Sequence, residues 1–237
     1  MVTRLCLNEL ASARARREES RPDRLPKPIT LDESGIGRVE TVDRISMAFL
    51  DVLQRLRPAE RAALLLHDVF DFSHAEIADL LGKSEAACRQ LLARAKAHAS
   101  SERTVLTASR EEHRRLLRAF LKAASAGDIG ELTRLLADDA VMIADGGARG
   151  VRIKGVRNLP RPLAGPAKIA SFVAAFARRP SPALEPRECE LNGQPAIVAL
   201  HEGRPVVAIL LAVADGRIRH LFFQADPARL GRIGMLH

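Results

Sequence analysis

The stretch FDFSHAEIADLLGKSEAACRQLLARAKAHA at residues 70–99 decides the fold of the middle of the chain. Ser73 followed by Glu76 is a capping-box pattern, which predicts a helix that begins directly after the serine. Gly82 can take the left-handed backbone that ends a helix, and Ser84 is a favoured residue for capping the next one. Two short helices joined through a glycine turn predict a helix-turn-helix.

Apolar residues around this pair of helices recur at helical spacing, which predicts a small core shared by neighbouring helices. Pro58 fits the first turn of the preceding helix, because an N–H is not needed there. The residues expected to be buried are Ile45, Phe49, Val52, Leu53 and Leu56, then Ala62, Leu65 and Val69, then Ile77, Ala78 and Leu81, and last Cys88, Leu91 and Leu92.

The second helix of the pair carries the residue types of a DNA-recognition helix, whose N-terminal end enters the major groove. Arg and Gln side chains there can make paired hydrogen bonds to guanine and adenine. Basic residues further along reach phosphates, which add affinity without sequence information. The alternative is an amphipathic helix pair with ordinary surface charges. The expected DNA-binding residues are Ser84, Glu85, Ala86, Arg89 and Gln90 at the start of the helix, with Arg94 and Lys96 towards the phosphates.

The distribution of charge supports a DNA-binding interpretation. The net charge of +8 and the isoelectric point of about 10.2 fit a polyanionic partner. Residues 38–82 hold five basic and eight acidic residues, a net charge of −3, whereas residues 83–110 hold six basic and two acidic residues, a net charge of +4. The sign changes at the glycine turn, as expected if only the second helix faces phosphates.

Composition argues against several other classes of protein. Tyr and Trp are absent and there are eight Phe, too few rings for a single-stranded nucleic acid platform. The three cysteines are far apart and lack C-x-x-C spacing, so we expect no disulfide, no metal site, no cofactor and a cytoplasmic protein. The chain holds no run of 18 apolar residues and no leader-like start, so we expect neither a membrane span nor secretion.

The chain changes character at three points, which predicts four segments. We expect a helix in residues 1–19, an extended linker in residues 20–38, a helical domain in residues 39–103 and a second domain in residues 110–237. The linker holds three prolines and two glycines without periodicity. The last segment combines helices with short β-like runs. The expected fold class is therefore an all-helical helix-turn-helix domain followed by an α+β domain.

Several motifs together resemble the extracytoplasmic-function (ECF) sigma factors, bacterial members of the sigma-70 family. Leu56–His98 resembles their region 4, and TRLCLNELASARARRE at residues 3–18 resembles the last helix of their region 2. RLPKP at residues 24–28 resembles the Trp-Leu-Pro-Glu-Pro linker of a subgroup with a SnoaL-like (NTF2-like) extension. DGG at Asp145–Gly147 and ADPARL at Ala225–Leu230 resemble the Asp-Gly-Gly-Gly-Lys and Asn-Pro-Asp-Lys-Leu signatures of that subgroup.

The resemblance implies that region 4 docks on the RNA polymerase core and reads the −35 promoter element, while the NTF2-like domain regulates activity. It also implies that the linker packs against the two later signatures, although both could be ordinary turns by spacing alone. Arg24, Lys27, Ala148 and Arg149 depart from the signature residues. The interdomain residues implied are Leu25, Pro26 and Pro28, then Asp145, Gly146 and Gly147, and last Asp226, Pro227 and Leu230.

The same resemblance aligns Met1 within the last helix of region 2, so we expect these 237 residues to lack most of the domain that reads and melts the −10 element. A truncated chain, a misplaced start codon and a degenerate gene all fit this. We expect these 237 residues by themselves to bind polymerase or −35 DNA without opening promoters. The first alternative function is accordingly a region-4-only regulator that binds DNA or polymerase.

The segment EEHRRLLRAFLKAASAGDIGELTRLLADDAVMIADGG at residues 111–147 resembles the opening of SnoaL-like domains. Such domains curl a sheet around a cone-shaped pocket, which makes a small-molecule ligand a candidate partner. In order, the sequence predicts a helix, a turn at Gly127–Asp128, a second helix through Leu132 and Leu136, a strand after Asp138 and Asp139, and hairpin turns at Gly203 and Asp215–Gly216.

A second alternative is a SnoaL-like isomerase or cyclase fused to a DNA-binding module. Ketosteroid-isomerase-like chemistry needs a carboxylate base and a donor to an oxyanion, often Tyr, which this chain lacks. The residues that would have to replace these groups are Asp139, Asp145, His201 and His220, but each fits an ordinary strand or turn position. We therefore predict no catalytic residue and no enzyme.

Overall fold

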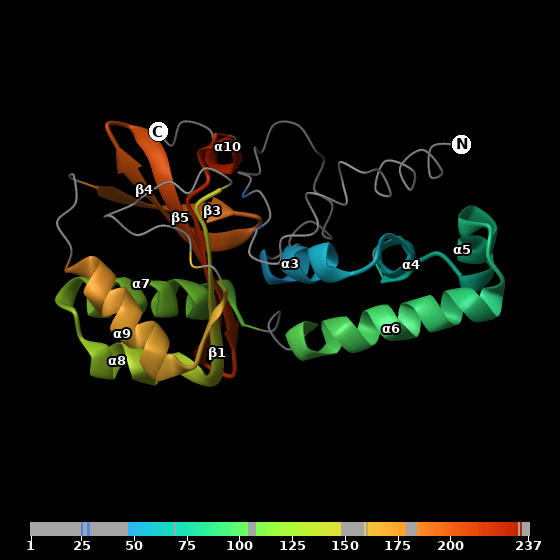
Figure 1. Ribbon diagram of the computed structural model, residues 1–237, viewed down its shortest axis with the longest axis horizontal. Helices are drawn as coiled ribbons and strands as arrows, with labels where there is room; N and C mark the ends of the chain where they lie inside the picture. Colours follow the sequence, from blue (N-terminus) through green and yellow to red (C-terminus); the bar gives the residue numbers. More distant parts are fainter. Residues whose placement is uncertain are drawn as a thin grey trace. The chain divides into compact units, whose positions relative to one another are not determined.

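The computed structural model describes Leu25, Pro28 and residues 47–68, 70–103, 108–147, 159, 161–178, 184–231 and 233. The chain divides into two compact units (Figure 1). The first comprises Met1–Pro22 and Phe49–Thr104, and the second comprises Asp23–Ala48 and Val105–His237. The predicted helix at residues 1–19 lies outside the described residues, as does the linker apart from Leu25 and Pro28.

The first unit is helical, and its central helices begin and end where the capping residues predicted. Its helices are α3 (Met47–Arg55), whose first two residues are assigned to the second unit, α4 (Pro58–Asp68), α5 (His74–Leu81) and α6 (Glu85–Arg103). Ser73 and Glu76 form the predicted capping box at the start of α5, with the Ser73 N–H donating to Glu76 Oε2 at 2.8 Å. Gly82 has φ 63°, and Ser84 Oγ accepts from the Ala87 N–H at 3.2 Å. The helix-turn-helix is therefore confirmed.

The prediction of the buried face of α4 was wrong at Ala62 and Leu65, and Val69 lies outside the described residues. Ala63 and Leu64 are buried, whereas Ala62 and Leu65 are only partly buried. Residues 62–66 are all apolar, so their pattern does not show which face of the helix is buried. Packing against α5 and α6 determines the buried face. The other predicted core residues found buried are Val52, Leu53, Leu56, Ile77, Ala78, Cys88, Leu91 and Leu92.

The second unit is an α+β domain with one curved sheet. The strands follow the order β2-β1-β6-β5-β4-β3, with β1 and β6 parallel and the other neighbours antiparallel. Its elements in chain order are α7 (Arg110–Ala126), α8 (Ile129–Leu135), β1 (Leu136–Asp145), β2 (Leu163–Ala164), α9 (Pro166–Ala177), β3 (Glu185–Leu191), β4 (Gln194–His201), β5 (Arg204–Ala214), β6 (Arg217–Gln224) and α10 (Pro227–Leu230).

Different parts of the chain pack against the two faces of this sheet. Helices α7, α8 and α9 lie together on one face (Figure 1), where Phe120, Leu132 and Ile169 are fully buried. The other face buries Leu25, from the linker, and Leu230, from α10. A linker residue is thus part of the core of the second unit.

The order of elements in this domain follows the sequence prediction with two corrections. Gly127 ends α7 with φ 67°, and Asp128 caps α8. Leu136 begins β1 rather than continuing α8, because its backbone is extended and it pairs with Ile218 on β6. Residues 166–177, for which no helix was predicted, form α9. The predicted hairpin turns at Gly203 and Asp215–Gly216 are confirmed, and the fold class is confirmed as well.

Candidate DNA-recognition helix and linker-binding site

The start of α6 presents the predicted base-reading residues on one exposed face. Glu85, Ala86, Arg89 and Gln90 are all exposed. Their spacing along the helix turns them away from the buried residues of the same segment, among which Cys88 is 1% exposed. The structure therefore brings these four side chains together at the end of the helix that a helix-turn-helix inserts into DNA.

An ion pair between Arg89 and Glu85 lies at the start of α6. Arg89 Nη1 lies 2.5 Å from Glu85 Oε1, but both side chains are about half exposed, so the pair contributes little to stability. The guanidinium carries five N–H donors, so pairing through one of them leaves others for a base edge. In the capping box of α5, the hydrogen bonds from Ser73 lower the pKa of Glu76.

Arg94 and Lys96 contact acidic residues of α4. Arg94 Nε donates to Glu60 Oε1 at 3.2 Å, and Lys96 Nζ lies 2.9 Å from Asp68 Oδ1. Glu60 is only 4% exposed, and its other oxygen accepts from the Arg57 N–H at the start of α4. The sequence reasoning considered only phosphates as partners for these two cations and missed both acids, so contact with phosphate stays a prediction for them.

In the second unit, Asp145 holds the backbone of the linker. The Asp145 carboxylate ends β1, is 1% exposed, and accepts from the Leu25 N–H at 3.0 Å through Oδ2 and from the Gly147 N–H at 2.9 Å through Oδ1. Gln224 Nε2 lies 3.4 Å and Arg229 Nε 3.7 Å from Oδ2. One buried carboxylate is thus surrounded by donors from the linker, β6 and α10.

The carbonyl of Leu25 is bound as well. It accepts from Gln224 Nε2 at 3.4 Å and from Arg229 Nη1. The Leu25 side chain is fully buried, and Pro28 is buried too. We name Leu25 together with Asp145, Gln224 and Arg229 the linker-binding site. It satisfies both backbone polar groups of a residue whose side chain lies in the core.

Gly147 joins the two signature motifs of the second unit. Its φ is 79°, and a Cβ placed there would lie 2.5 Å from Asp226 Cγ. Only glycine accepts both the left-handed backbone and this close approach. Asp226 in turn caps α10 by accepting from the Ala228 N–H at 3.0 Å, and it lies 3.7 Å from Arg229 Nε.

Comparison with known proteins accounts for this combination of domains. The family model described as Sigma-70, region 4, matches residues 46–98. The probable ECF RNA polymerase sigma factor SigI of Mycobacterium tuberculosis is 28% identical over 239 residues, which cover 97% of this chain and 76% of SigI. The ECF RNA polymerase sigma factor SigJ of the same organism is 32% identical over 189 residues, which cover 78% of this chain and 58% of SigJ. The chain belongs to the ECF sigma factors.

The fold of the whole chain agrees with this family. The crystal structure of Mycobacterium tuberculosis SigJ superposes with a TM-score of 0.69 at 24% identity, covering 93% of this chain and 80% of that one. The first unit holds the region 4 helix-turn-helix, and the second is the NTF2-like extension. Membership of this family implies the RNA polymerase core and promoter DNA as partners.

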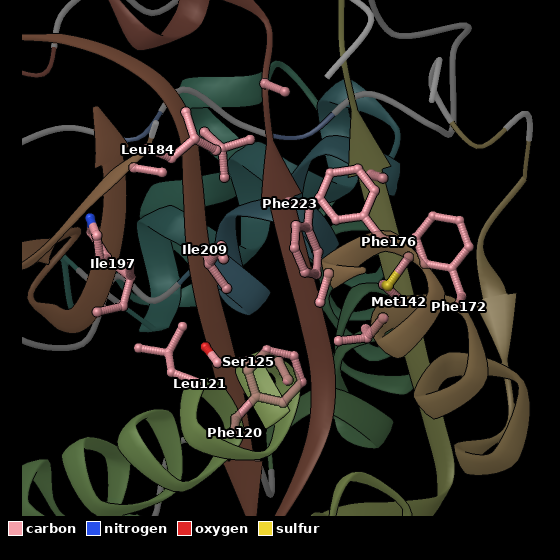
Figure 2. Close-up of a pocket in the computed structure, with 18 of the residues that line it drawn as sticks. Phe120, Leu121, Ser125, Met142, Phe172, Phe176, Leu184, Ile197, Ile209 and Phe223 are labelled. Carbon is pink, nitrogen blue, oxygen red and sulfur yellow. The ribbon is translucent and has the colours of Figure 1, made fainter. Parts of the chain in front are cut away.

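The NTF2-like domain of this ECF sigma factor contains a cavity of about 430 Å³ that is open to solvent on one side, shown in Figure 2. Among the four residues weighed for catalysis and set aside, Asp145 lines it, whereas Asp139, His201 and His220 are not among the described residues of its wall. Asp139 instead accepts from Arg219 Nε at 2.9 Å on the exposed end of β1. The structure therefore does not bring the four catalytic candidates together.

Sequence reasoning missed part of the linker-binding site. Gln224 was not predicted, and Arg229 was noted only as part of the ADPARL motif. An arginine three residues after Asp226 on a helix nevertheless indicates an ion pair, which the structure contains. Pro26 lies outside the described residues, and Pro227 is exposed at the first position of α10.

The described part of the chain gives little support to a metal site or to a reactive cysteine. No group of three His, Cys, Asp or Glu side chains there is placed to hold a metal ion. Burial raises the pKa of Cys88, and burial followed by the charge of Glu190 raises the pKa of Cys189 to about 11, so both thiols are held in the protonated form. No described helix is long and apolar enough to span a membrane.

Proposed function

We propose that this chain directs RNA polymerase to promoters by placing the start of α6 in the major groove at the −35 element. The observation that supports this is the exposed cluster of Glu85, Ala86, Arg89 and Gln90, opposite the buried face of the same helix. Arg89 and Gln90 are assigned to base edges, because their side chains can make two hydrogen bonds to one base. Ser84 caps the helix and orients it.

We assign different roles to the two cations further along α6. Arg94 mainly holds α6 on α4, because its partner Glu60 is buried and needs a counter-charge. Lys96 is partly exposed, pairs with the partly buried Asp68, and remains the better candidate for a phosphate contact.

The NTF2-like domain acts in this proposal as a binding and regulatory domain rather than as an enzyme. Its linker-binding site holds Leu25, within the segment Asp23–Ala48 that precedes the region 4 helices in the chain. Release of that segment from the NTF2-like domain frees the chain on the N-terminal side of region 4, while the direct connection at Thr104–Val105 stays. The cavity of this domain receives a small molecule.

Arg89→Ala tests the base-reading role. A preferred −35 duplex is first selected from a randomised library with the unaltered protein, and binding is then compared on that duplex and on a scrambled one. Arg89→Ala should lose about 1–3 kcal/mol on the preferred duplex and little on the scrambled one. Lys96→Ala should weaken both duplexes similarly and flatten the salt dependence. Equal losses on both duplexes for Arg89→Ala would remove Arg89 from base reading.

Hydrogen exchange of residues 22–30 tests the linker-binding site. The Leu25 amide should be protected in the full chain, and Asp145→Asn should reduce that protection, because one amide oxygen cannot replace the two carboxylate oxygens that accept here. Asp139→Asn, on the same strand but exposed, is the matched control and should leave protection unchanged. Exchange at free-peptide rates in the unaltered protein would exclude linker docking.

A further inference from the structure

We propose that the cavity of the NTF2-like domain binds an uncharged, mainly apolar small molecule with an aromatic ring, and that this ligand tightens the hold of the domain on the linker. The proposal rests on the proposed regulatory role of the linker-binding site. It adds the chemical class of the ligand and the contacts through which ligand binding affects the linker.

The cavity has the size and the lining of a site for such a molecule. Its volume of about 430 Å³ lies in the range of small-molecule pockets. Four of the eight Phe of the chain line it, namely Phe120 of α7, Phe172 and Phe176 of α9, and Phe223 of β6. Figure 2 shows these rings around one space, with Met142 and Ile209 on the sheet side. Such a surface favours a flat aromatic ligand.

The described residues of the wall offer no free charge to balance a charged ligand. Asp145 is the one ionisable side chain among the described residues that line the cavity, and its two oxygens already accept hydrogen bonds from Leu25 and Gly147. The Asp145 carboxylate is turned towards Leu25 and is paired with Arg229 there, so a charged ligand would find no counter-charge among the described residues of the wall, and its loss of hydration would not be compensated. The Ser125 hydroxyl offers one hydrogen bond to a neutral polar group on the ligand.

The cavity and the linker-binding site have one residue in common, Asp145. Asp145, Gly146 and Ala225 line the cavity, and the Ala225 N–H donates to the Asp145 carbonyl at 2.6 Å. The side chain of the same Asp145 holds the Leu25 N–H. A ligand that fills the cavity next to Asp145 therefore supports the ends of β1 and β6 in the geometry that binds the linker. Binding of the ligand and of the linker should then strengthen each other, because coupling between two sites is reciprocal.

The first experiment measures binding with N-phenyl-1-naphthylamine, an uncharged aromatic probe that fluoresces in apolar surroundings. We expect saturable binding at one site in the full chain. The anionic analogue 1-anilinonaphthalene-8-sulfonate has the same ring skeleton and should bind at least about tenfold more weakly. No saturable binding of the neutral probe, or equal binding of the two probes, would overturn the proposed ligand class.

Cavity-filling variants show where the probe binds. Ala124→Phe on α7 and Ala177→Phe on α9 each add a ring to the cavity wall and should weaken binding at least about tenfold. Ala126→Phe adds the same ring at an exposed position of α7 that is not among the lining residues, and it should bind as the unaltered chain does. Circular dichroism checks that each variant is folded. Unchanged binding in both folded cavity variants would place the probe elsewhere and overturn the proposal.

The second experiment measures hydrogen exchange of residues 22–30 with and without saturating N-phenyl-1-naphthylamine. The probe should slow exchange of the Leu25 amide by at least about threefold, and the Ala124→Phe variant should not respond. Unchanged or faster exchange at saturation would overturn the coupling while leaving the linker-binding site intact. Free-peptide rates without the probe would instead contradict the proposed function itself, so the two failures are distinguishable.

Discussion

In region 4, the caps that orient the recognition helix join residues three positions apart, whereas the linker-binding site joins Leu25 to Asp145 across 120 positions and to Arg229 across 204. The first kind of contact is available as soon as a short segment becomes helical. The second kind exists only after the sheet has formed and the linker has returned to it, because distant contacts require the intervening chain to be ordered.

The two kinds of contact also differ in burial and therefore in energy. A helix cap at an exposed position typically contributes about 1 kcal/mol. The carboxylate of Asp145 is buried and meets both N–H groups and a guanidinium, and removing one member of such a group exposes the others to a large desolvation cost. Substitutions should consequently have larger effects in the NTF2-like domain than in region 4.

The largest effect is expected for Asp145→Ala. It leaves Arg229 and the Leu25 N–H without their buried acceptor, which should cost about 3–5 kcal/mol in the free energy of unfolding of the NTF2-like domain. Urea unfolding followed by circular dichroism measures the loss, and hydrogen exchange assigns it to one unit. Asp139→Ala, whose partner Arg219 is near the surface, is the control. A loss no greater than that of the control would remove the contrast between the two regions.

This contrast explains which features the sequence could predict. The start and end of α5 and the start of α6 depend on Ser73, Glu76, Gly82 and Ser84, each of which acts within one helical turn. Such patterns can be recognised in a single sequence. The exposed face of α6 follows from the same helix spacing.

The features that were missed depend on partners elsewhere in the chain. Leu136 leaves the helical pattern because it pairs with Ile218, and the buried face of α4 is selected by α5 and α6. The signatures around Asp145 and Asp226 were recognised only by resemblance, and Gln224 was not identified, since nothing local relates it to Leu25. Tertiary packing, rather than local propensity, fixes these positions.

The second prediction concerns Gly147→Ala. At φ 79° any residue with a Cβ is strained, and here the Cβ also lies 2.5 Å from Asp226 Cγ. Gly203→Ala is the matched control, because its φ is 74° and nothing lies within 4 Å of the added atom. Both variants should lose about 1 kcal/mol from backbone strain. Gly147→Ala should lose about 1–3 kcal/mol more from overpacking against Asp226.

Thermal unfolding of these two glycine variants, together with exchange of residues 22–30, measures that difference. Gly147→Ala should also speed exchange of the linker, since Asp145 accepts from the Gly147 N–H. Equal losses of stability for both glycine variants would mean that the close approach of Gly147 to Asp226 does not affect stability. The two signatures would then be independent turns.

The third prediction concerns the long-range contact of region 4 between Arg94 and Glu60, and how much it stabilises that domain. Arg94 pairs with the buried Glu60 across 34 positions, and it is 56% exposed, so part of the interaction is screened. Arg94→Ala should destabilise region 4 by about 1–2 kcal/mol, because Glu60 loses a donor. Lys96→Ala should cost less than about 0.5 kcal/mol.

A double-mutant cycle separates the role of Arg94 in the fold from any contact with DNA. Glu60→Gln removes the buried charge, so adding Arg94→Ala to it should cost less than in the unaltered protein. Additive losses would indicate that Arg94 and Glu60 do not depend on each other, and a phosphate contact would then be the better account of this arginine.

The smallest effect is expected from His113, which links α7 to the sheet across 98 positions. Its Nε2 lies 3.0 Å from the Leu211 carbonyl, so Nε2 carries the proton in the neutral ring. Burial lowers the pKa of His113, while the Leu211 carbonyl and Glu112 act in the opposite direction.

Because the pKa of His113 is lower in the folded chain, the unfolded chain binds a proton first as the pH falls below about 6.5. The stability contributed by this group is therefore complete above that pH and is lost as the pH falls towards the folded pKa. His113→Gln keeps an N–H donor for Leu211 but cannot titrate. Its melting temperature should fall less between pH 7 and pH 5 than that of the unaltered protein, as measured by circular dichroism. Parallel curves for the two proteins would show that this buried contact does not couple proton binding to folding.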